Sequence, residues 1–400
     1  MLEPHARAKA LQGEGAFAWL KKATDWEHET GRKAIQFEIG EPDFQTPQNI
    51  CDAAIRALRD GKTKYTPSQG IRELRVAVAD FLSKRRGVEI DPDCVIIGPG
   101  CKPVINACFQ CMVNQCAPNA AVILPNPVYG PYLDNAYYVG AKTFSIPLRQ
   151  EHDWRYDADV LEDVLKSIPA GLDKILVLVS PSNPTGGVLT HEDLMFIAEL
   201  AEKYDLTIVS DEIYDDIVFS EHHEHASILS FPEMAERTFL MHGASKSWAM
   251  TGWRLGWGVV PKRFVPEVSK MLGHLASCTN TFTQYAGIEA VSGPQNAVEE
   301  MTVEYKHRRD FAVKALRELG CTVAVPMGSF YIFPNVRTWM DKKGANETEL
   351  CERMLREIGV VCLPGPGFGS QGKDHIRFSL VSSYDDLQVA FERIRAWLEK

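Results

Sequence analysis

The sequence predicts an α/β protein with a mostly parallel sheet, helices on both faces of that sheet, and a second, smaller α/β region. Short apolar runs alternate along the chain with amphipathic helical patterns, as parallel sheets require. A polar or glycine-rich motif follows each run, and such sheets bind ligands beyond the carboxyl ends of their strands. The 400 residues, 45% of them hydrophobic, suffice for one large domain and a smaller one.

The composition is that of an ordinary globular protein. Charged residues make up 24% of the chain, and the formal net charge is −10. This acidic balance argues against nucleic acid or an anionic membrane as the main partner. No apolar run approaches the roughly 20 residues that a membrane span needs, and the polar N-terminal residues lack the apolar core of a signal peptide. We therefore expect a cytoplasmic protein with no nucleic-acid or membrane partner.

Cysteine and histidine patterns give little support for a metal site. The ten cysteines are scattered along the chain and are interpreted as free thiols in a reducing compartment. Cys108 and Cys111 form a C-x-x-C pair, but no second pair completes a zinc site. His222, His223 and His225 fall in a hydrophilic stretch with no helical face to bring them together. We predict no metal site.

Before residue 90 the pattern alternates helix, strand, helix and helix. The expected elements are a helix over 13–30, a strand within 35–44, a helix between 46 and 61, and a helix over 71–86. Thr46 as N-cap and Pro47 at the first position predict the start of the second helix, and Gly61 predicts its end. Gly40, where the strand breaks, lets the backbone approach a ligand closely.

Five apolar runs then predict buried strands. They span residues 94–97, 121–124, 175–179, 207–209 and 238–241, with helices expected from about 102 to 113 and over 192–203. Because the carboxyl ends of parallel strands share one edge of the sheet, the polar motifs after these runs are expected to meet there.

The C-terminal part predicts a separate region. A long charged helix over 294–319, closed by Gly320, leads into it. Strands are expected at 328–333, 360–363 and 375–379, with helices at 347–358 and 384–398. The glycine loop 364–372 precedes a strand rather than a helix, so it is interpreted as a turn that supports Arg377. The predicted division is an N-terminal arm and part of the small domain (1–46), a large domain (47–290) and a small domain (291–400).

The functional prediction rests on the stretch 242–258. Lys246 follows a buried run and is surrounded by small residues, and burial disfavours the ammonium form of lysine. A neutral amine attacks a carbonyl to form a Schiff base. Arg254 carries the planar fork that binds a phosphate through two hydrogen bonds. Together they suggest pyridoxal phosphate (PLP), although this stretch alone equally fits two solvated surface groups.

The motifs after the other strands supply further groups. Asp211 follows a buried run and needs a positive partner, which the protonated pyridine nitrogen of PLP provides. Tyr214 and Asn183 are candidates for the phenolic oxygen, and Tyr129 is a candidate to stack on the ring. Arg377 is a candidate to bind a substrate carboxylate. Each residue alone also fits an ordinary turn or packing role.

The loop 98–102 offers backbone N–H groups at the start of a helix, which is an anion site. It begins G-x-G, but Pro103 occupies the position of the third glycine, so it is no dinucleotide-binding fingerprint. A plain turn between strand and helix fits the loop as well.

These motifs together resemble class I/II PLP-dependent aminotransferases of the aspartate aminotransferase superfamily, over nearly the whole chain. The segments that carry the resemblance are 38–44, 65–70, 182–186, 211–214, 245–247, 250–256 and 377–379. The resemblance implies fold type I, a large domain with a seven-stranded, mostly parallel sheet between helices plus a smaller α/β domain. Three positions depart from the usual residues, Cys101, Gly243 and Ser329, and none of them removes a core group.

The resemblance also implies the roles of individual residues. Lys246 would form the Schiff base with PLP, and the catalytic residues would be Lys246, Asp211 and Tyr214. The implied cofactor-binding residues are Tyr65, Gly100, Cys101, Lys102, Tyr129, Asn183, Asp211, Tyr214, Ser245, Lys246 and Arg254. The substrate α-carboxylate would face Gly40, Asn183 and Arg377. Tyr65 would reach the phosphate in the neighbouring subunit, which implies a homodimer with shared active sites.

The implied activity is transfer of an amino group between an L-amino acid and a 2-oxo acid, with aspartate-type or broad specificity. Another PLP reaction on the same fold, such as C–S lysis, decarboxylation or oxidation, remains an alternative because fold does not fix reaction. A non-catalytic PLP-binding module is a further alternative. Nitrogen transfer without release of ammonia or CO₂ would identify the aminotransferase.

Overall fold

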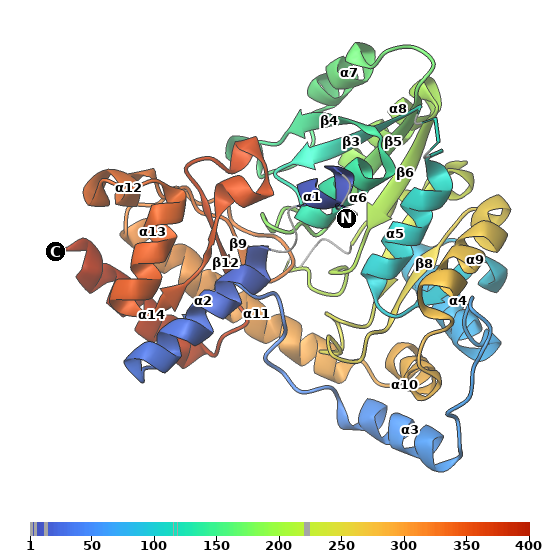
Figure 1. Cartoon of the computed structure of the whole chain (residues 1–400), viewed down its shortest axis with the longest axis horizontal. Helices are drawn as coiled ribbons and strands as arrows, with labels where there is room; N and C mark the ends of the chain where they lie inside the picture. The colour runs from blue at the N-terminus through green and yellow to red at the C-terminus, as the bar shows by residue number, and fades with distance from the viewer. Residues whose placement is uncertain (1–2, 4–5, 12–14, 115, 118, 220–224) are drawn as a thin grey trace.

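The computed structural model describes the chain except residues 1–2, 4–5, 12–14, 115, 118 and 220–224. Its main element is a seven-stranded sheet in the order β2-β8-β7-β6-β5-β3-β4 (Figure 1). The strands are β2 (Val95–Gly98), β3 (Ala120–Asn126), β4 (Lys142–Pro147), β5 (Asp173–Val179), β6 (Leu206–Asp211), β7 (Thr238–Gly243) and β8 (Gly256–Val259). Only β8 runs antiparallel to its neighbours within this sheet. The predicted mostly parallel sheet is confirmed.

Alternate side chains of the strands face two layers of helices. On β3, Val122 and Leu124 pack against one layer, whereas Ala121 and Ile123 pack against the other. The first layer contains α5 (Cys101–Met112), α6 (Gly130–Val139) and α9 (Val265–Ala276). The second contains α4 (Arg72–Arg86), α7 (Ala158–Ser167), α8 (His191–Tyr204) and α10 (Thr281–Ser292). Burial on both faces explains why the strands are continuous apolar runs.

Side-chain caps decide where some helices begin. The Thr190 hydroxyl accepts from the Asp193 N–H at 3.1 Å, and the Asp193 carboxylate accepts from the Thr190 N–H at 2.8 Å, so α8 begins with a capping box. The prediction of Thr46 as an N-cap is wrong. Helix α3 (Gln48–Arg59) begins without a side-chain cap, because the Thr46 hydroxyl instead donates to the carbonyl of Ala249 at 2.7 Å.

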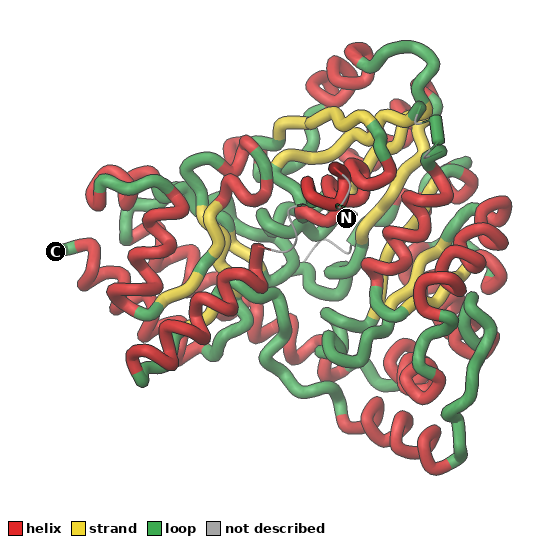
Figure 2. Tube along the Cα trace, in the orientation of Figure 1, coloured by secondary structure: helices red, strands yellow, loops and turns green. Residues whose placement is uncertain are grey.

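The N-terminal and C-terminal segments meet in a smaller region, whose short strands lie apart from the large sheet in Figure 2. Strand β1 (Ile35–Gln36) pairs in parallel with β10 (Val360–Val361). Strands β11 (Leu363–Pro364), β12 (Ile376–Ser379) and β9 (Tyr331–Ile332) form an antiparallel sheet. The helices here are α2 (Gly15–Thr30), α11 (Asn296–Glu318), α12 (Arg337–Lys343), α13 (Glu347–Arg353) and α14 (Tyr384–Leu398). The division of the chain at residues 46 and 290 stays a prediction.

Some expectations about elements differ from the structure. The strand expected within 35–44 is only two residues long, because the chain after Phe37 leaves the β1–β10 ladder and enters the site described below. The helix expected over 347–358 is α13 followed by a π-helical turn over Met354–Ile358, which ends at Gly359 with φ 65°. Strands β4 and β8 and helices α6, α7, α9 and α10 were not anticipated. The short helix α1 (Ala6–Ala10) lies against α6.

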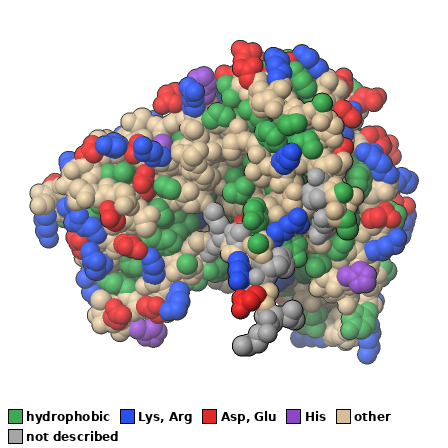
Figure 3. Space-filling model, turned by 45° about the horizontal axis from the view of Figure 1, so that its top comes forward, with side chains coloured by type: hydrophobic (Ala, Val, Ile, Leu, Met, Phe, Trp, Pro, Cys, Tyr) green, Lys and Arg blue, Asp and Glu red, His purple; other side chains and the backbone are tan. Residues whose placement is uncertain are grey.

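The apolar content of the described helices and the charges on the face drawn in Figure 3 are both ordinary. Within the described part of the chain, none of the helices combines the length and the apolar content that crossing a membrane requires. On the face drawn in Figure 3, acidic and basic side chains are interspersed, and neither sign gathers into one large patch.

Candidate active site

Lys246 lies in the turn that follows β7, at the carboxyl edge of the sheet. Its Nζ donates to the carbonyl oxygen of Gly40 at 2.5 Å. It also lies 5.8 Å from the ring centroid of Tyr214 and 5.7 Å from that of Phe330. Burial, reinforced by the charge of Arg377, lowers the pKa of Lys246 to about 8. The neutral amine is therefore a minor but accessible form at pH 7 and becomes the major form above pH 8.

Asp211 ends the neighbouring strand β6. The Tyr132 hydroxyl donates to Oδ2 of Asp211 at 2.7 Å, and the N–H of Ile213 donates to Oδ1 at 3.2 Å. Burial raises the pKa of Asp211 to about 6, although both hydrogen bonds lower it. Among the described residues, no lysine or arginine forms an ion pair with this carboxylate. A buried carboxylate without a cation needs a positive partner from a ligand.

Tyrosines surround the space between Lys246 and Asp211. The hydroxyl oxygens of Tyr214 and Tyr331 lie 3.1 Å apart. The ring centroids of Tyr129 and Tyr132 are 6.4 Å apart, and Tyr129 is half-buried. Sequence reasoning gave no role to Tyr132 or Tyr331. The available signal for Tyr132 was its spacing, three residues after Tyr129 at the start of a helix, where both side chains share one face.

Positive groups gather at the N-terminus of α5. The helix begins at Cys101, and the preceding Gly100 has φ 97°. A Cβ at Gly100 would collide with the Arg254 guanidinium, so glycine is required for Arg254 to lie over this helix start. Burial and the charge of Arg254 lower the pKa of Lys102 to about 8. With Ser245 half-buried in the turn before the lysine, this arrangement fits a dianion such as a phosphate.

Arg377 occupies the opposite side of the site, on β12 in the smaller region. Its Nη1 donates to Oδ1 of Asn183 at 2.9 Å, and its Nη2 donates to the carbonyl oxygen of Glu38. The guanidinium carbon lies 4.3 Å from the ring centroid of Tyr331 and 5.1 Å from that of Phe368. Phe368 belongs to the loop 364–372, so this loop does support Arg377. The side chain is buried, yet its Nε has no hydrogen-bond partner among the described residues.

Gly40 lies beside Lys246 and Tyr331. Its carbonyl oxygen accepts from Lys246, and a Cβ at this position would overlap the hydroxyl of Tyr331. Only glycine fits there, which explains the break in the strand pattern. The structure thus brings together every predicted site residue but one. The exception is Tyr65. Its side chain is 88% exposed, and among the described residues it forms no hydrogen bond or ring contact with the other predicted site residues.

A groove opens beside the lysine turn. Its volume is about 540 Å³, and its lining residues lie within 41–46, 249–253 and 280–283. The lining begins at Glu41, the residue after Gly40, whose carbonyl oxygen accepts from Lys246.

Comparison with known proteins agrees with this geometry. Residues 32–394 match the family model for aminotransferase class I and II. This chain belongs to that family. Aromatic-amino-acid aminotransferase 2 of Thermococcus litoralis is 37% identical over 369 residues, which cover 92% of each chain. An aspartate aminotransferase of Pyrococcus horikoshii is 37% identical over 369 residues, 91% of this chain and 90% of that protein. The solved structure of aspartate aminotransferase from Thermus thermophilus with maleate has a TM-score of 0.91 at 31% identity, covering 99% of this chain and 100% of that one.

Membership confirms three predictions, namely fold type I, a PLP-dependent aminotransferase, and PLP as the cofactor. The residues of this aminotransferase fit PLP. Asp211 is a buried carboxylate with no lysine or arginine paired to it among the described residues, so a protonated pyridine nitrogen would supply its missing positive partner. The start of α5, with Arg254 beside it, suits a phosphate. The pKa of Lys246 is lowered to about 8, which suits an amine that forms a Schiff base.

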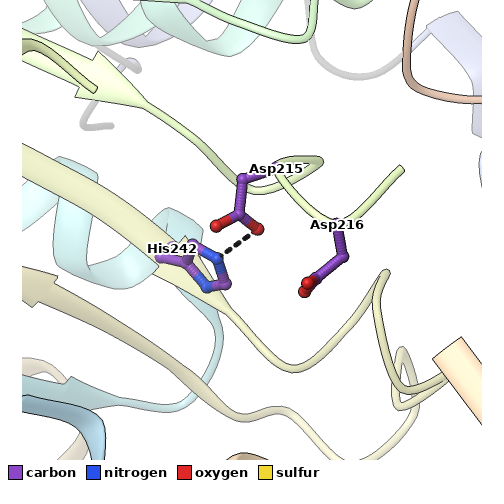
Figure 4. A group of neighbouring side chains, drawn as sticks. All are labelled: Asp215, Asp216 and His242. Carbon is purple, nitrogen blue, oxygen red and sulfur yellow. Dashed lines mark hydrogen bonds and ion pairs between the residues drawn. The ribbon is translucent and has the colours of Figure 1, made fainter. Parts of the chain in front are cut away.

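A cluster of acidic and histidine side chains lies behind the aminotransferase site. The ligand atoms of Asp215, Asp216 and His242 are all within 4.8 Å of one another (Figure 4). Arginine supplies the positive charge here, because Arg86 Nη2 lies 2.6 Å from Asp215 Oδ2 and Arg85 Nη2 lies 2.5 Å from Asp216 Oδ1. The cluster is therefore an ion-pair network rather than a metal centre.

The other histidines and cysteines singled out in the sequence lie in different surroundings. His225 lies with its Nε2 3.1 Å from Oε2 of Glu212, so it joins the same network. His222 and His223 lie outside the described residues. Cys108 and Cys111 are free thiols on α5.

Proposed function

We propose that this aminotransferase moves an amino group between an aspartate-type or aromatic L-amino acid and a 2-oxo acid, with Lys246 as the catalytic lysine. The observation that carries the proposal is the spacing of two cationic groups along one backbone segment. Arg377 binds the carbonyl of Glu38, and Lys246 binds the carbonyl of Gly40, two residues further on. An amino acid held by its α-carboxylate at Arg377 therefore presents its Cα toward the amine of Lys246.

The residues divide the work of the reaction. When bound, PLP supplies an electron sink for the charge left at the substrate Cα. The Nζ of Lys246 would move a proton between the substrate Cα and the cofactor carbon within each half-reaction, acting as general base and then as general acid. The carboxylate of Asp211 would hold a proton at the pyridine nitrogen, and Tyr214 and Asn183 would donate hydrogen bonds to the phenolic oxygen. Tyr129 stacks on the ring and keeps water from that face.

Binding of the two anionic groups is assigned to opposite sides of the site. The backbone from Gly100 to Lys102, with Ser245 and Arg254, binds the phosphate. Arg377, held by Asn183, binds the substrate α-carboxylate beside Gly40. Because the charges of Arg254 and Arg377 lie on different structural regions, phosphate and carboxylate do not compete for one cation.

The breadth of substrate is supported by the relatives, one named for aromatic amino acids and one for aspartate. The Thermus enzyme was solved with maleate, which is a dicarboxylate.

We also propose a cytoplasmic homodimer, active in amino-acid metabolism, in which Tyr65 completes the phosphate site of the partner subunit. The side chain of Tyr65 is 88% exposed in the single chain, so it is accessible to a neighbouring subunit. Mixing inactive Lys246→Ala protein with Tyr65→Ala protein tests this. Shared sites would restore about a quarter of wild-type activity, because half of the dimers would be mixed and each would hold one intact site. No gain on mixing would refute shared sites.

The reaction itself is tested with a panel of L-amino acids and 2-oxo acids, by following the visible spectrum of PLP and the amino-acid product. Aspartate or an aromatic amino acid should transfer its nitrogen to 2-oxoglutarate without release of ammonia or CO₂. Release of either product at the rate of amino-acid loss would contradict the proposal.

A further inference from the structure

A buried polar network lies directly behind the site and takes no part in the reaction proposed above. The segment 211–216 starts at the last residue of β6, and its side chains point in two directions. Asp211 and Tyr214 face the cofactor space, whereas Glu212 and Asp215 face the end of helix α4. The groups that hold Glu212 and Asp215 therefore also fix Asp211 and Tyr214.

Arg86, the last residue of α4, supplies the positive charge of this network. Its Nη2 lies 2.8 Å from Oε2 of Glu212 and 2.6 Å from Oδ2 of Asp215, and the exposed fractions of the three side chains are 1%, 1% and 0%. Removing such charges from water costs several kcal/mol per ion unless they are paired. Burial alone would raise the pKa of Asp215, but His242 and Arg86 hold it well below its usual range. Asp215 is thus an ionised, fully buried acceptor.

His242 connects Asp215 to the strand that carries the lysine. Its Nε2 lies 2.7 Å from Oδ1 of Asp215, and the N–H of Gly243 donates to its Nδ1 at 2.7 Å. Because Nδ1 accepts a hydrogen bond, the ring proton sits on Nε2 and is donated to Asp215. The imidazole stacks on Trp257 with ring centroids 5.2 Å apart and an interplanar angle of 14°, so its orientation is fixed.

This hydrogen bond is placed where the backbone pairing stops. The β6–β7 ladder ends at the pair Asp211 and Met241, and the N–H of Glu212 donates to the carbonyl of Met241 at 2.9 Å. Beyond that point, no backbone hydrogen bond joins residues 213–216 to residues 242–247 in the described chain. Figure 4 shows the His242 ring and the Asp215 carboxylate facing each other across this gap.

We propose that His242, through its hydrogen bond to Asp215, is a positioning residue that fixes Asp211 and Tyr214 relative to Lys246. The inference rests on the proposed roles of these three residues. His242 touches neither substrate nor cofactor. It holds the segment 211–216 to β7 beyond the end of the ladder, and Arg86 keeps Asp215 ionised as the acceptor.

Two substitutions at the same position separate this role from simple packing. His242→Gln retains a donor at the place of Nε2, so the link to Asp215 survives. His242→Asn retains an acceptor at the place of Nδ1 but is too short to reach Asp215. Neither variant changes the net charge of the buried network. Both are made in the full-length protein and studied with and without PLP.

Three readouts are compared between the two variants. Amide hydrogen exchange of residues 212–217 in the PLP-free protein should rise at least about tenfold in His242→Asn and stay within about threefold of wild type in His242→Gln. The dissociation constant for PLP should rise about tenfold in His242→Asn only. The kcat for the best amino donor should fall about tenfold in His242→Asn, with a KM change below about threefold.

Asp215→Ala removes the acceptor of the link, together with one partner of Arg86, and serves if His242→Asn folds poorly. In the Asp215→Ala background, His242→Asn should have little further effect on PLP affinity, because the hydrogen bond between the two residues is already absent. Equal exchange in the Gln and Asn variants, additive effects, or faster exchange with unchanged PLP affinity and kcat would each overturn the proposal. If the wild-type protein transfers no amino group, the proposed function fails, whereas the exchange comparison still decides whether the link exists.

Discussion

The two sides of the active site satisfy their buried charges in different ways. Behind the lysine, the carboxylate of Glu212 faces Arg86 and accepts from the hydroxyls of Ser210 and Ser227 at 3.0 and 2.7 Å. On the substrate side, both carboxylate oxygens of Glu38 are buried and have no hydrogen-bond partner among the described residues. Polar groups that the chain itself satisfies hold a fixed geometry, whereas groups left open respond to a ligand or a proton.

The pKa values of these two glutamates express the same difference. Burial tends to raise the pKa of Glu212, but Arg86 and His225 outweigh it and lower the value to about 2. Burial raises the pKa of Glu38 to about 7, because the charge of Arg377 only partly offsets it. The carboxylate of Glu212 behind Lys246 therefore stays ionised across the physiological pH range. The carboxyl group of Glu38 on the substrate side gains or loses its proton within that pH range.

The largest effect is expected from Lys246, where the two sides meet. Lys246→Ala should lower kcat by at least about 10³-fold, because the general base and acid is lost. The half-reaction with the best amino donor measures this, together with the visible spectrum of bound PLP. PLP affinity should survive in part, since Asp211 and the start of α5 remain. An activity within tenfold of wild type would exclude Lys246 as the catalytic lysine.

Substitution of Glu38 should stabilise the protein at pH 8, whereas substitution of Glu212 should destabilise it. The folded chain keeps the Glu38 proton to a higher pH than the unfolded chain, so stability falls as pH rises from about 4.5 to about 7. Glu38→Gln should therefore be more stable than wild type by up to about 3 kcal/mol at pH 8, with little difference near pH 5.

The control for this comparison is Glu212→Gln, which should destabilise the protein at pH 8 because it leaves Arg86 short of a counter-charge. Urea unfolding at both pH values gives the free energies of unfolding. A stability difference between Glu38→Gln and wild type that is the same at pH 5 and pH 8 would show that Glu38 does not titrate in this range.

Arg377 should affect binding rather than the chemical step. Arg377→Lys retains the charge but loses the planar fork, and hydrogen bonds to charged groups contribute about 1.5–3 kcal/mol. The KM for the amino acid should rise roughly ten- to a hundredfold, with a smaller change in kcat. Steady-state kinetics with one amino donor measures both. A fall in kcat with an unchanged KM would assign Arg377 to the reaction rather than to the substrate carboxylate.

The smallest effect concerns the pH dependence of PLP uptake. The pKa of Lys246 is lowered to about 8, so the neutral amine is the minor form below pH 8 and the major form above it. The rate of PLP incorporation into PLP-free protein should rise about tenfold between pH 6 and 7, rise less between pH 7 and 8, and level off above pH 8. Stopped-flow absorbance follows the rate. A rate still rising tenfold per pH unit above pH 9 would place the pKa of Lys246 near that of an exposed lysine.

Much of the fold and of the site followed from local patterns. The apolar runs at 121–124 and 175–179 lie within β3 and β5, and the expected helix over 384–398 coincides with α14. These predictions succeeded because burial on both faces of a strand and one-sided burial of a helix each leave a periodic trace in the sequence. The alternation of runs and helices likewise placed Asp211 and Lys246 at one edge of the sheet.

Contacts between distant segments left no such trace. The sequence by itself determined the α/β class and the family and singled out Lys246 as the proposed catalytic lysine, because these depend on neighbours in the chain and on residue chemistry. Only the tertiary structure showed that Tyr132 binds Asp211, that Arg377 binds the carbonyl of Glu38, and that His242 faces Asp215. Each of these contacts joins residues whose proximity is set by strand order and by the packing of distant segments, and local periodicity encodes neither of them.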